Sequence, residues 1–136
     1  MSINDESSVP VAMIMHTSVQ AIDRQSTLRT AAGRLRDAEV GTLAIMEGSA
    51  IAGIVSERDV VRALADGADP DEVWVGDVMS ELPRYLTPGD SVHGALEVML
   101  AAGIRHLPVV DEGELVGIVS IRDVARHLRH WTHTPV

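Results

Sequence analysis

A heptapeptide pattern, Gly-Ile-Val-Ser-x-Arg-Asp, occurs twice in the chain, at residues 53–59 and 117–123. In each copy an apolar run typical of a β-strand ends at the serine, and a helix is expected to begin directly after it. The serine then lies at the helix N-cap, where exposed N–H groups and the helix dipole favour an anion. The aspartate can accept hydrogen bonds from two ribose hydroxyls, and the arginine before it offers a fork-shaped phosphate donor. The pattern predicts a nucleotide site at each helix start.

The same residue types also have a purely structural interpretation. Ser-x-x-Asp is a variant of the capping box, so a helix start without any ligand explains the serine and the aspartate. Capping does not require the arginine, yet the arginine occurs in both copies. Both interpretations therefore stay open for the six residues of the pattern, which are Ser56, Arg58 and Asp59 in the first copy and Ser120, Arg122 and Asp123 in the second.

The two copies belong to an internal duplication of the whole chain. Residues 53–64 and 117–128 are identical at nine of twelve positions, and the offset of 64 residues also pairs Leu43 with Leu107 without a gap. The duplication predicts a polar N-terminal tail at 1–8, a first repeat at 9–68, a second repeat at 69–128 and a C-terminal tail at 129–136.

Each repeat is expected to fold as a β-α-β-β-α unit. In the second repeat a helix begins at Asp90 or Ser91 and ends near Gly103. Two apolar runs around the turn at 111–114 predict a hairpin, and another helix follows from Ser120. A three-stranded sheet of this size leaves one apolar face to be covered. We therefore expect an α+β fold in which the two repeats pack as a pseudo-twofold sandwich.

Composition excludes several classes of protein. The 136 residues are 46% apolar, and 11 basic against 20 acidic residues give a net charge of −9, which argues against direct contact with nucleic acid. Every basic residue is arginine and cysteine is absent, so lysine chemistry, thiolate metal sites and cysteine nucleophiles are impossible. Because no apolar run reaches 18 residues and the N-terminus is polar and acidic, we expect a cytoplasmic protein without a membrane partner.

The repeat, the Leu107–Asp111 strand and turn, and the duplicated heptapeptide resemble the CBS domain. The chain from Val9 to Leu128 resembles one tandem CBS pair with no other domain attached. The resemblance implies a Bateman module, which is a non-catalytic regulatory unit that binds AMP, ADP, ATP or S-adenosylmethionine in clefts between its two repeats. It also implies a homodimer that signals to a protein target, with no catalytic cofactor and no metal.

The resemblance further implies roles for individual residues. Asp59 and Asp123 match the ribose-binding aspartates of the family, and Ser56 and Ser120 match its phosphate-side hydroxyl. Each cleft in such modules also uses the early segment of the opposite repeat. The remaining expected residues are Met15, His16, Gln20, Val40 and Gly41 at the Asp123 cleft, and Met79, Ser80, Arg84 and Ile104 at the Asp59 cleft.

Basic residues distinguish the two expected clefts. Arg105 and His106 precede the central strand of the second repeat, where the family often places phosphate-contacting residues, and Gly41-Thr42 stands at this position in the first repeat. We expect the Asp123 cleft to be the stronger site, although Arg84 serves the other one.

Two other classes of function stay open. A degenerate CBS pair could act as a dimerising adaptor that holds a protein partner without any nucleotide. His127, His130 and His133 recur every third residue, and in a suitable turn they could bind a divalent metal, although a surface helix explains them as well. A serine hydrolase is excluded because the chain has no Gly-x-Ser-x-Gly elbow.

Overall fold

A computed structural model describes residues 9–81 and 84–132, without the side chains of 130–132. The chain divides into two compact units. The middle unit is Val19–Pro83, and the terminal unit combines Met1–Ser18 with Arg84–Val136. No helix in the described part of the chain is long and apolar enough to cross a membrane.

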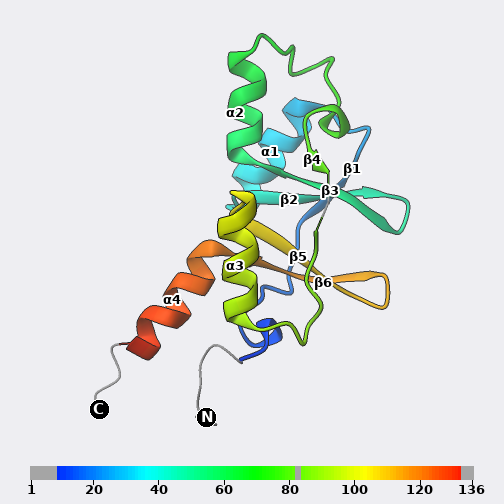
Figure 1. Cartoon of the computed structure of the whole chain (residues 1–136). Helices are drawn as coiled ribbons and strands as arrows, with labels where there is room; N and C mark the ends of the chain where they lie inside the picture. Colours follow the sequence, from blue (N-terminus) through cyan, green and yellow to red (C-terminus); the bar gives the residue numbers. More distant parts are fainter. Residues whose placement is uncertain (1–8, 82–83, 133–136) are drawn as a thin grey trace. The chain divides into compact units, whose positions relative to one another are not determined.

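The middle unit is a four-stranded sheet with two helices (Figure 1). The strand order is β1-β2-β3-β4, in which β1 runs parallel to β2 and the other neighbours are antiparallel. Its elements are β1 (Ala21–Asp23), α1 (Leu28–Ala38), β2 (Thr42–Glu47), β3 (Ala50–Ser56), α2 (Glu57–Ala65), the 3-10 helix η3 (Val75–Asp77) and β4 (Ser80–Glu81).

The terminal unit repeats this arrangement around a hairpin. Single bridges extend the hairpin at both edges, from Leu86 in parallel to Val109 and from His16 antiparallel to Ile118. The elements are the 3-10 helix η2 (Val11–Met13), α3 (Val92–Ala102), β5 (His106–Asp111), β6 (Glu114–Ser120) and α4 (Ile121–Thr132). The predicted hairpin and helix starts are confirmed, with Ser91 as the N-cap of α3 and Gly103 as its left-handed C-cap.

An edge segment that the three-stranded prediction lacked joins each sheet. In the middle unit it is β4, in which Ser80 pairs with Ile54, and in the terminal unit it is His16 beside Ile118. The offset of 64 residues relates these two pairs, so both units share the feature. One or two residues of edge pairing leave no alternation in a sequence, which is why the pattern did not show them.

A glycine makes each edge pairing possible. A Cβ atom on Gly53 would lie 2.6 Å from both Met79 Sδ and the Ser80 carbonyl oxygen. On Gly117 it would lie 2.7 Å from Met15 Sδ and 3.0 Å from a backbone oxygen. At Gly53 the distance to the Ser80 carbonyl is shorter than a Cβ atom can tolerate, so glycine is needed for the approach of β4. At Gly117 the backbone contact is at the limit, and Met15 would have to move as well.

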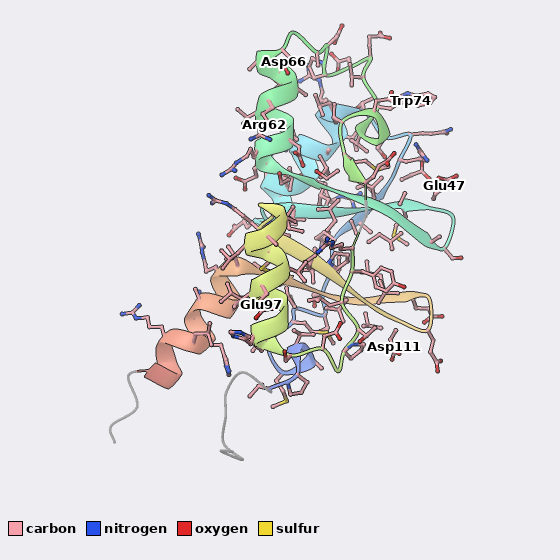
Figure 2. All side chains as sticks on the ribbon, in the orientation of Figure 1. Glu47, Arg62, Asp66, Trp74, Glu97 and Asp111 are labelled. Carbon is pink, nitrogen blue, oxygen red and sulfur yellow. The ribbon has the colours of Figure 1, made fainter. Side chains whose placement is uncertain are left out.

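Each unit encloses its own hydrophobic core, built largely from equivalent positions of the two repeats. Burial of each of these side chains contributes roughly 1.5–3 kcal/mol. The fully buried large residues are Leu28, Leu43, Ile45, Val55 and Val75 in the middle unit, and Val11, Val92, Met99, Leu107, Val109, Val119 and Val124 in the terminal unit. Figure 2 shows Glu47 and Asp111, a repeat-related pair, near the ends of the two hairpins, away from these cores.

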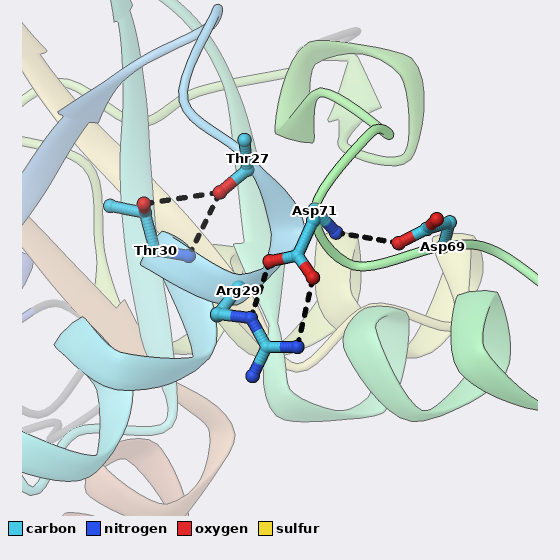
Figure 3. Close-up of polar contacts among 5 residues, drawn as sticks. All are labelled: Thr27, Arg29, Thr30, Asp69 and Asp71. Atoms are coloured by element: carbon cyan, nitrogen blue, oxygen red, sulfur yellow. Dashed lines mark hydrogen bonds and ion pairs between the residues drawn. The ribbon is translucent and has the colours of Figure 1, made fainter.

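An ion pair ties the start of α1 to the loop after α2 (Figure 3). Arg29 donates from Nε to Asp71 Oδ1 at 2.5 Å and from a terminal nitrogen to Oδ2 at 3.1 Å. The hydrogen bond and charge of Arg29 lower the pKa of Asp71. The Asp69 carboxylate accepts from the Asp71 backbone N–H in the same loop, so this acidic connection has a defined local geometry.

Replacing Gly53 by alanine tests the close approach of β4. Because the new methyl group meets the Ser80 backbone and not only a flexible side chain, we expect Gly53→Ala to lower the free energy of unfolding by about 1–3 kcal/mol. Gly89→Ala is the matched control, since a Cβ atom there meets nothing within 4 Å. Urea denaturation measures both variants, and equal stability of the two would contradict the role of Gly53.

Candidate functional site

The start of α2 is a complete capping box. Ser56 Oγ accepts from the Asp59 backbone N–H at 3.2 Å. Asp59 Oδ2 in turn accepts from the Ser56 backbone N–H at 2.8 Å and from Ser56 Oγ at 3.0 Å. The helix therefore uses one carboxylate oxygen of Asp59, and Oδ1 has no hydrogen bond to the residues that the structure describes.

The start of α4 has the same geometry. Asp123 Oδ2 accepts from Ser120 Oγ at 2.7 Å and from the Ser120 backbone N–H at 3.2 Å, while Ser120 Oγ accepts from the Asp123 N–H at 3.0 Å. The capping interpretation of the sequence motif is thus confirmed at both helices. It does not exclude a ligand, because capping uses the Oδ2 side of each carboxylate.

His16 distinguishes the second site from the first. Its Nε2 lies 3.1 Å from Asp123 Oδ1 and 3.0 Å from Oδ2. The imidazole is 64% exposed, whereas the Asp123 side chain is only 10% exposed. The structure therefore brings together His16 and Asp123, which are 107 residues apart in the sequence.

The environment of Asp123 favours its charged form. Burial alone raises the pKa of this carboxyl group, but the hydrogen bonds from Ser120 and His16 together outweigh burial. The pKa of Asp123 therefore lies below its usual range, and the group is an ionised acceptor at neutral pH.

The two helix starts differ in local charge. The first turn of α2 carries Glu57 beside Asp59, whereas α4 has Ile121 at the equivalent position. The Glu57 N–H donates to the Gly41 carbonyl at 3.0 Å, and the Ile121 N–H donates to the Arg105 carbonyl at 2.8 Å. Compared with the first site, the second site has an apolar residue in place of Glu57 and Arg105 in place of Gly41. This difference in charge favours phosphate at the second site.

Thr42 is a candidate that the sequence motifs did not single out. It faces Ser56 across the β2–β3 ladder, as His106 faces Ser120 across β5–β6. Thr42 is 8% exposed, and its buried Oγ1 makes no hydrogen bond with the part of the chain that the structure describes. The sequence could have indicated Thr42, because the 64-residue offset relates it to His106, which is a predicted site residue.

The other predicted site residues divide between the two units. Met15 and Met79 lie against Gly117 and Gly53, and Arg58, Arg122 and Ser80 are exposed. Several residues lie in a different unit from the aspartate to which they were assigned, and their contribution to that site stays a prediction. They are Gln20, Val40 and Gly41 in the middle unit, and Arg84 and Ile104 in the terminal unit.

The C-terminal histidines gain no support as a metal centre. No group of three or more His, Cys, Asp or Glu residues that could hold a metal ion occurs within the described residues. His133 and the side chain of His130 lie outside the described part of the chain. The structure therefore does not test the metal alternative, which rests on all three histidines.

Comparison with known proteins agrees with the duplicated fold. The CBS-domain profile matches residues 11–66 and 75–130. The chain is 34% identical over 117 residues to Hypoxic response protein 1 of Mycobacterium tuberculosis, covering 85% of this chain and 82% of the relative. It is 33% identical over 112 residues to a CBS domain-containing protein of Bacillus subtilis, covering 82% and 79%. The chain belongs to the CBS-domain family, and it carries two CBS domains in tandem.

Solved structures share this architecture. A CBS-domain protein from Pyrobaculum aerophilum, complexed with AMP, is 28% identical with a TM-score of 0.82, over 93% of this chain and 100% of the other. Hypoxic Response Protein I, solved with two coordinated zinc ions, is 31% identical with a TM-score of 0.76, over 93% and 100%.

The lowered pKa of Asp123 predicts a pH-dependent contribution to stability. Because its folded pKa lies below the unfolded value of 3.8, the contribution is present above that pH and is lost as pH falls through the folded pKa. We expect Asp123→Asn to lower the free energy of unfolding by about 1–2 kcal/mol at pH 7. The difference from the unmodified protein should shrink below about pH 4. Denaturant titrations at several pH values measure it, and a constant difference down to pH 3 would contradict the charge argument.

Proposed function

We propose that this CBS pair is a regulatory module that binds a phosphorylated adenosine ligand of the AMP, ADP or ATP type at Asp59 and Asp123. The observation that carries the proposal is the repeated Ser–Asp capping box, in which the helix occupies Oδ2 of each carboxylate. Oδ1 of Asp59 makes no hydrogen bond with the described residues, and Oδ1 of Asp123 contacts only the exposed imidazole of His16 among them. Both oxygens are candidate acceptors for the ribose hydroxyls of a ligand, at Asp123 once His16 is displaced. The AMP complex of the Pyrobaculum aerophilum relative supports this ligand class.

Local charge favours a nucleotide over S-adenosylmethionine at the second site. Arg122 is exposed on the first turn of α4. Arg105 directly precedes β5, and its carbonyl group accepts a hydrogen bond from the N–H of the first residue of α4. Arg122 on the first helical turn, together with a second arginine whose backbone bonds that turn, favours phosphate over a sulfonium cation. We expect Asp123 to belong to the tighter of the two sites.

The ligand would act as a signal and not as a substrate. CBS domains are generally non-catalytic regulatory modules, and the two serine hydroxyl groups of the proposed site are engaged in capping the helices. Ligand binding would shift the module between arrangements in proportion to its differential affinity for them. We further propose that the module forms a homodimer and that a protein target responds to this shift.

A thermal-shift experiment tests ligand binding directly. AMP at about 100 times its dissociation constant should add roughly 2.7 kcal/mol of stability, which raises Tm by several degrees. ADP, ATP, S-adenosylmethionine and Zn²⁺ are compared at the same concentration. We expect Asp123→Ala to lose most of the AMP shift and Asp59→Ala to lose less.

Glu72→Ala is the control for loss of one acidic side chain, because Glu72 is exposed and lies in the loop after α2. It should keep the full AMP shift. If no adenosine compound shifts Tm in the unmodified protein, the proposal fails and the ligand-free adaptor becomes the better account.

Thr42 supplies a second test at the first site. Its buried hydroxyl has no partner among the described residues, so Thr42→Val should leave the ligand-free protein as stable or raise its stability by about 1 kcal/mol. The same change should weaken AMP binding at the Asp59 site, because a ligand there would lose a hydrogen-bonding group. Denaturation and calorimetric titration in an Asp123→Ala background measure both effects. Loss of stability with unchanged AMP affinity would show that Thr42 serves the fold alone.

A further inference from the structure

The backbone holds His16 firmly beside β6. Its N–H donates to the Ile118 carbonyl at 2.9 Å, and its own carbonyl accepts from the Ile118 N–H at 2.9 Å. Gly117 permits this approach, and Met15 packs against that glycine. The preceding 3-10 helix anchors the segment through Val11, which is fully buried in the core of the terminal unit. The contact of His16 with Asp123 therefore follows from an anchored backbone.

The first site lacks this contact. The 64-residue offset relates His16 to Ser80, and Ser80 pairs with Ile54 as His16 pairs with Ile118. Ser80 makes no hydrogen bond to Asp59 among the contacts of the described residues. The duplication has thus produced two sites with the same capping box and the same edge pairing, but with an imidazole against the carboxylate in only one.

We propose that His16 is a pH-dependent latch on the Asp123 carboxylate, which a ligand must displace in order to bind its ribose there. This inference rests on the proposed function and adds a regulation of the second site that the first site does not have. Nε2 lies within 3.1 Å of both carboxylate oxygens, so the imidazole competes with any ligand hydroxyl for the same acceptor.

The sign of the pH effect follows from charge. Asp123 is ionised at neutral pH, so protonation of His16 turns its hydrogen bond to the carboxylate into an ion pair. The latch therefore strengthens as pH falls through the range in which histidine titrates, and affinity for the ribose weakens. A ligand that displaces protonated His16 from Asp123 should also release a fraction of a proton.

The elements next to the pair carry other charged or titratable groups, and their effects must be separated from that of His16. Arg105 directly precedes β5, His106 is the first residue of β5, and Arg122 and His127 lie on α4. All four groups are present both in the unmodified protein and in the His16→Ser variant, so the comparison between these two proteins isolates the effect of His16.

Calorimetric titration with adenosine, in an Asp59→Asn background, tests the latch at the second site. Adenosine carries the ribose hydroxyls but no phosphate, which removes attraction between protonated histidine and phosphate. Between pH 7.5 and 5.5 we expect affinity to fall by roughly threefold to tenfold, since one pKa unit corresponds to a tenfold change. Titrations in two buffers of different ionisation enthalpy should show proton release on binding.

The duplication provides the matched variants. His16→Ser gives the second site the residue of the first, and it should raise adenosine affinity at pH 5.5 and abolish the proton release. Ser80→His, measured in an Asp123→Asn background, should introduce the same pH dependence at Asp59.

The possible outcomes separate the latch from the proposed function. Adenosine binding with the same pH dependence and proton release in the His16→Ser variant would overturn the latch alone. Affinity that rises as pH falls would also overturn it, because His16 would then assist the ligand. If neither adenosine nor AMP binds any variant at pH 7.5, the proposed function fails and the latch fails with it.

Discussion

The hydrogen bonds between a serine and an aspartate at two helix starts are the interactions on which this account depends. The serine hydroxyl accepts a hydrogen bond from an N–H group of the first helical turn. One carboxylate oxygen of the aspartate accepts a hydrogen bond from the backbone N–H of the serine. The same geometry ends a strand, begins a helix and holds a carboxyl group at the positive end of the helix dipole. Structural capping is therefore one use of this arrangement, and the ligand binding that we propose is a second.

The second constraint is the close approach of an edge segment to the middle of a strand. Gly53 and Gly117 permit it, and Ser80 and His16, which follow Met79 and Met15, are thereby paired with β3 and β6. Because both repeats have this close approach, the two sites share a backbone arrangement and differ in the side chains at equivalent positions. Ser80 and His16 show the difference most clearly, since His16 alone of the two contacts the aspartate of its site among the described residues.

Much of the fold could be predicted from the sequence because its signals are local or repeated. The apolar runs around residues 111–114 and the glycine at position 103 directly predicted a hairpin and a helix end, and the structure confirms both. The edge pairing of His16 with Ile118 could not be predicted, because a single bridge leaves no periodicity. The family resemblance indicated His16 as a site residue, but only the structure shows its contact with Asp123. The buried hydroxyl of Thr42 likewise has no sequence signature, since its lack of a partner depends on packing.

The most direct test of the central claim compares AMP with its 2′,3′-dideoxy analogue in calorimetric titrations of the unmodified protein. If Asp59 and Asp123 accept the ribose hydroxyls, loss of both hydroxyls removes hydrogen bonds to a charged group, worth about 1.5–3 kcal/mol each. The account predicts that AMP binds at least about tenfold more tightly than the dideoxy compound. Equal affinity for the two nucleotides would contradict it and would leave the two aspartates as helix caps alone.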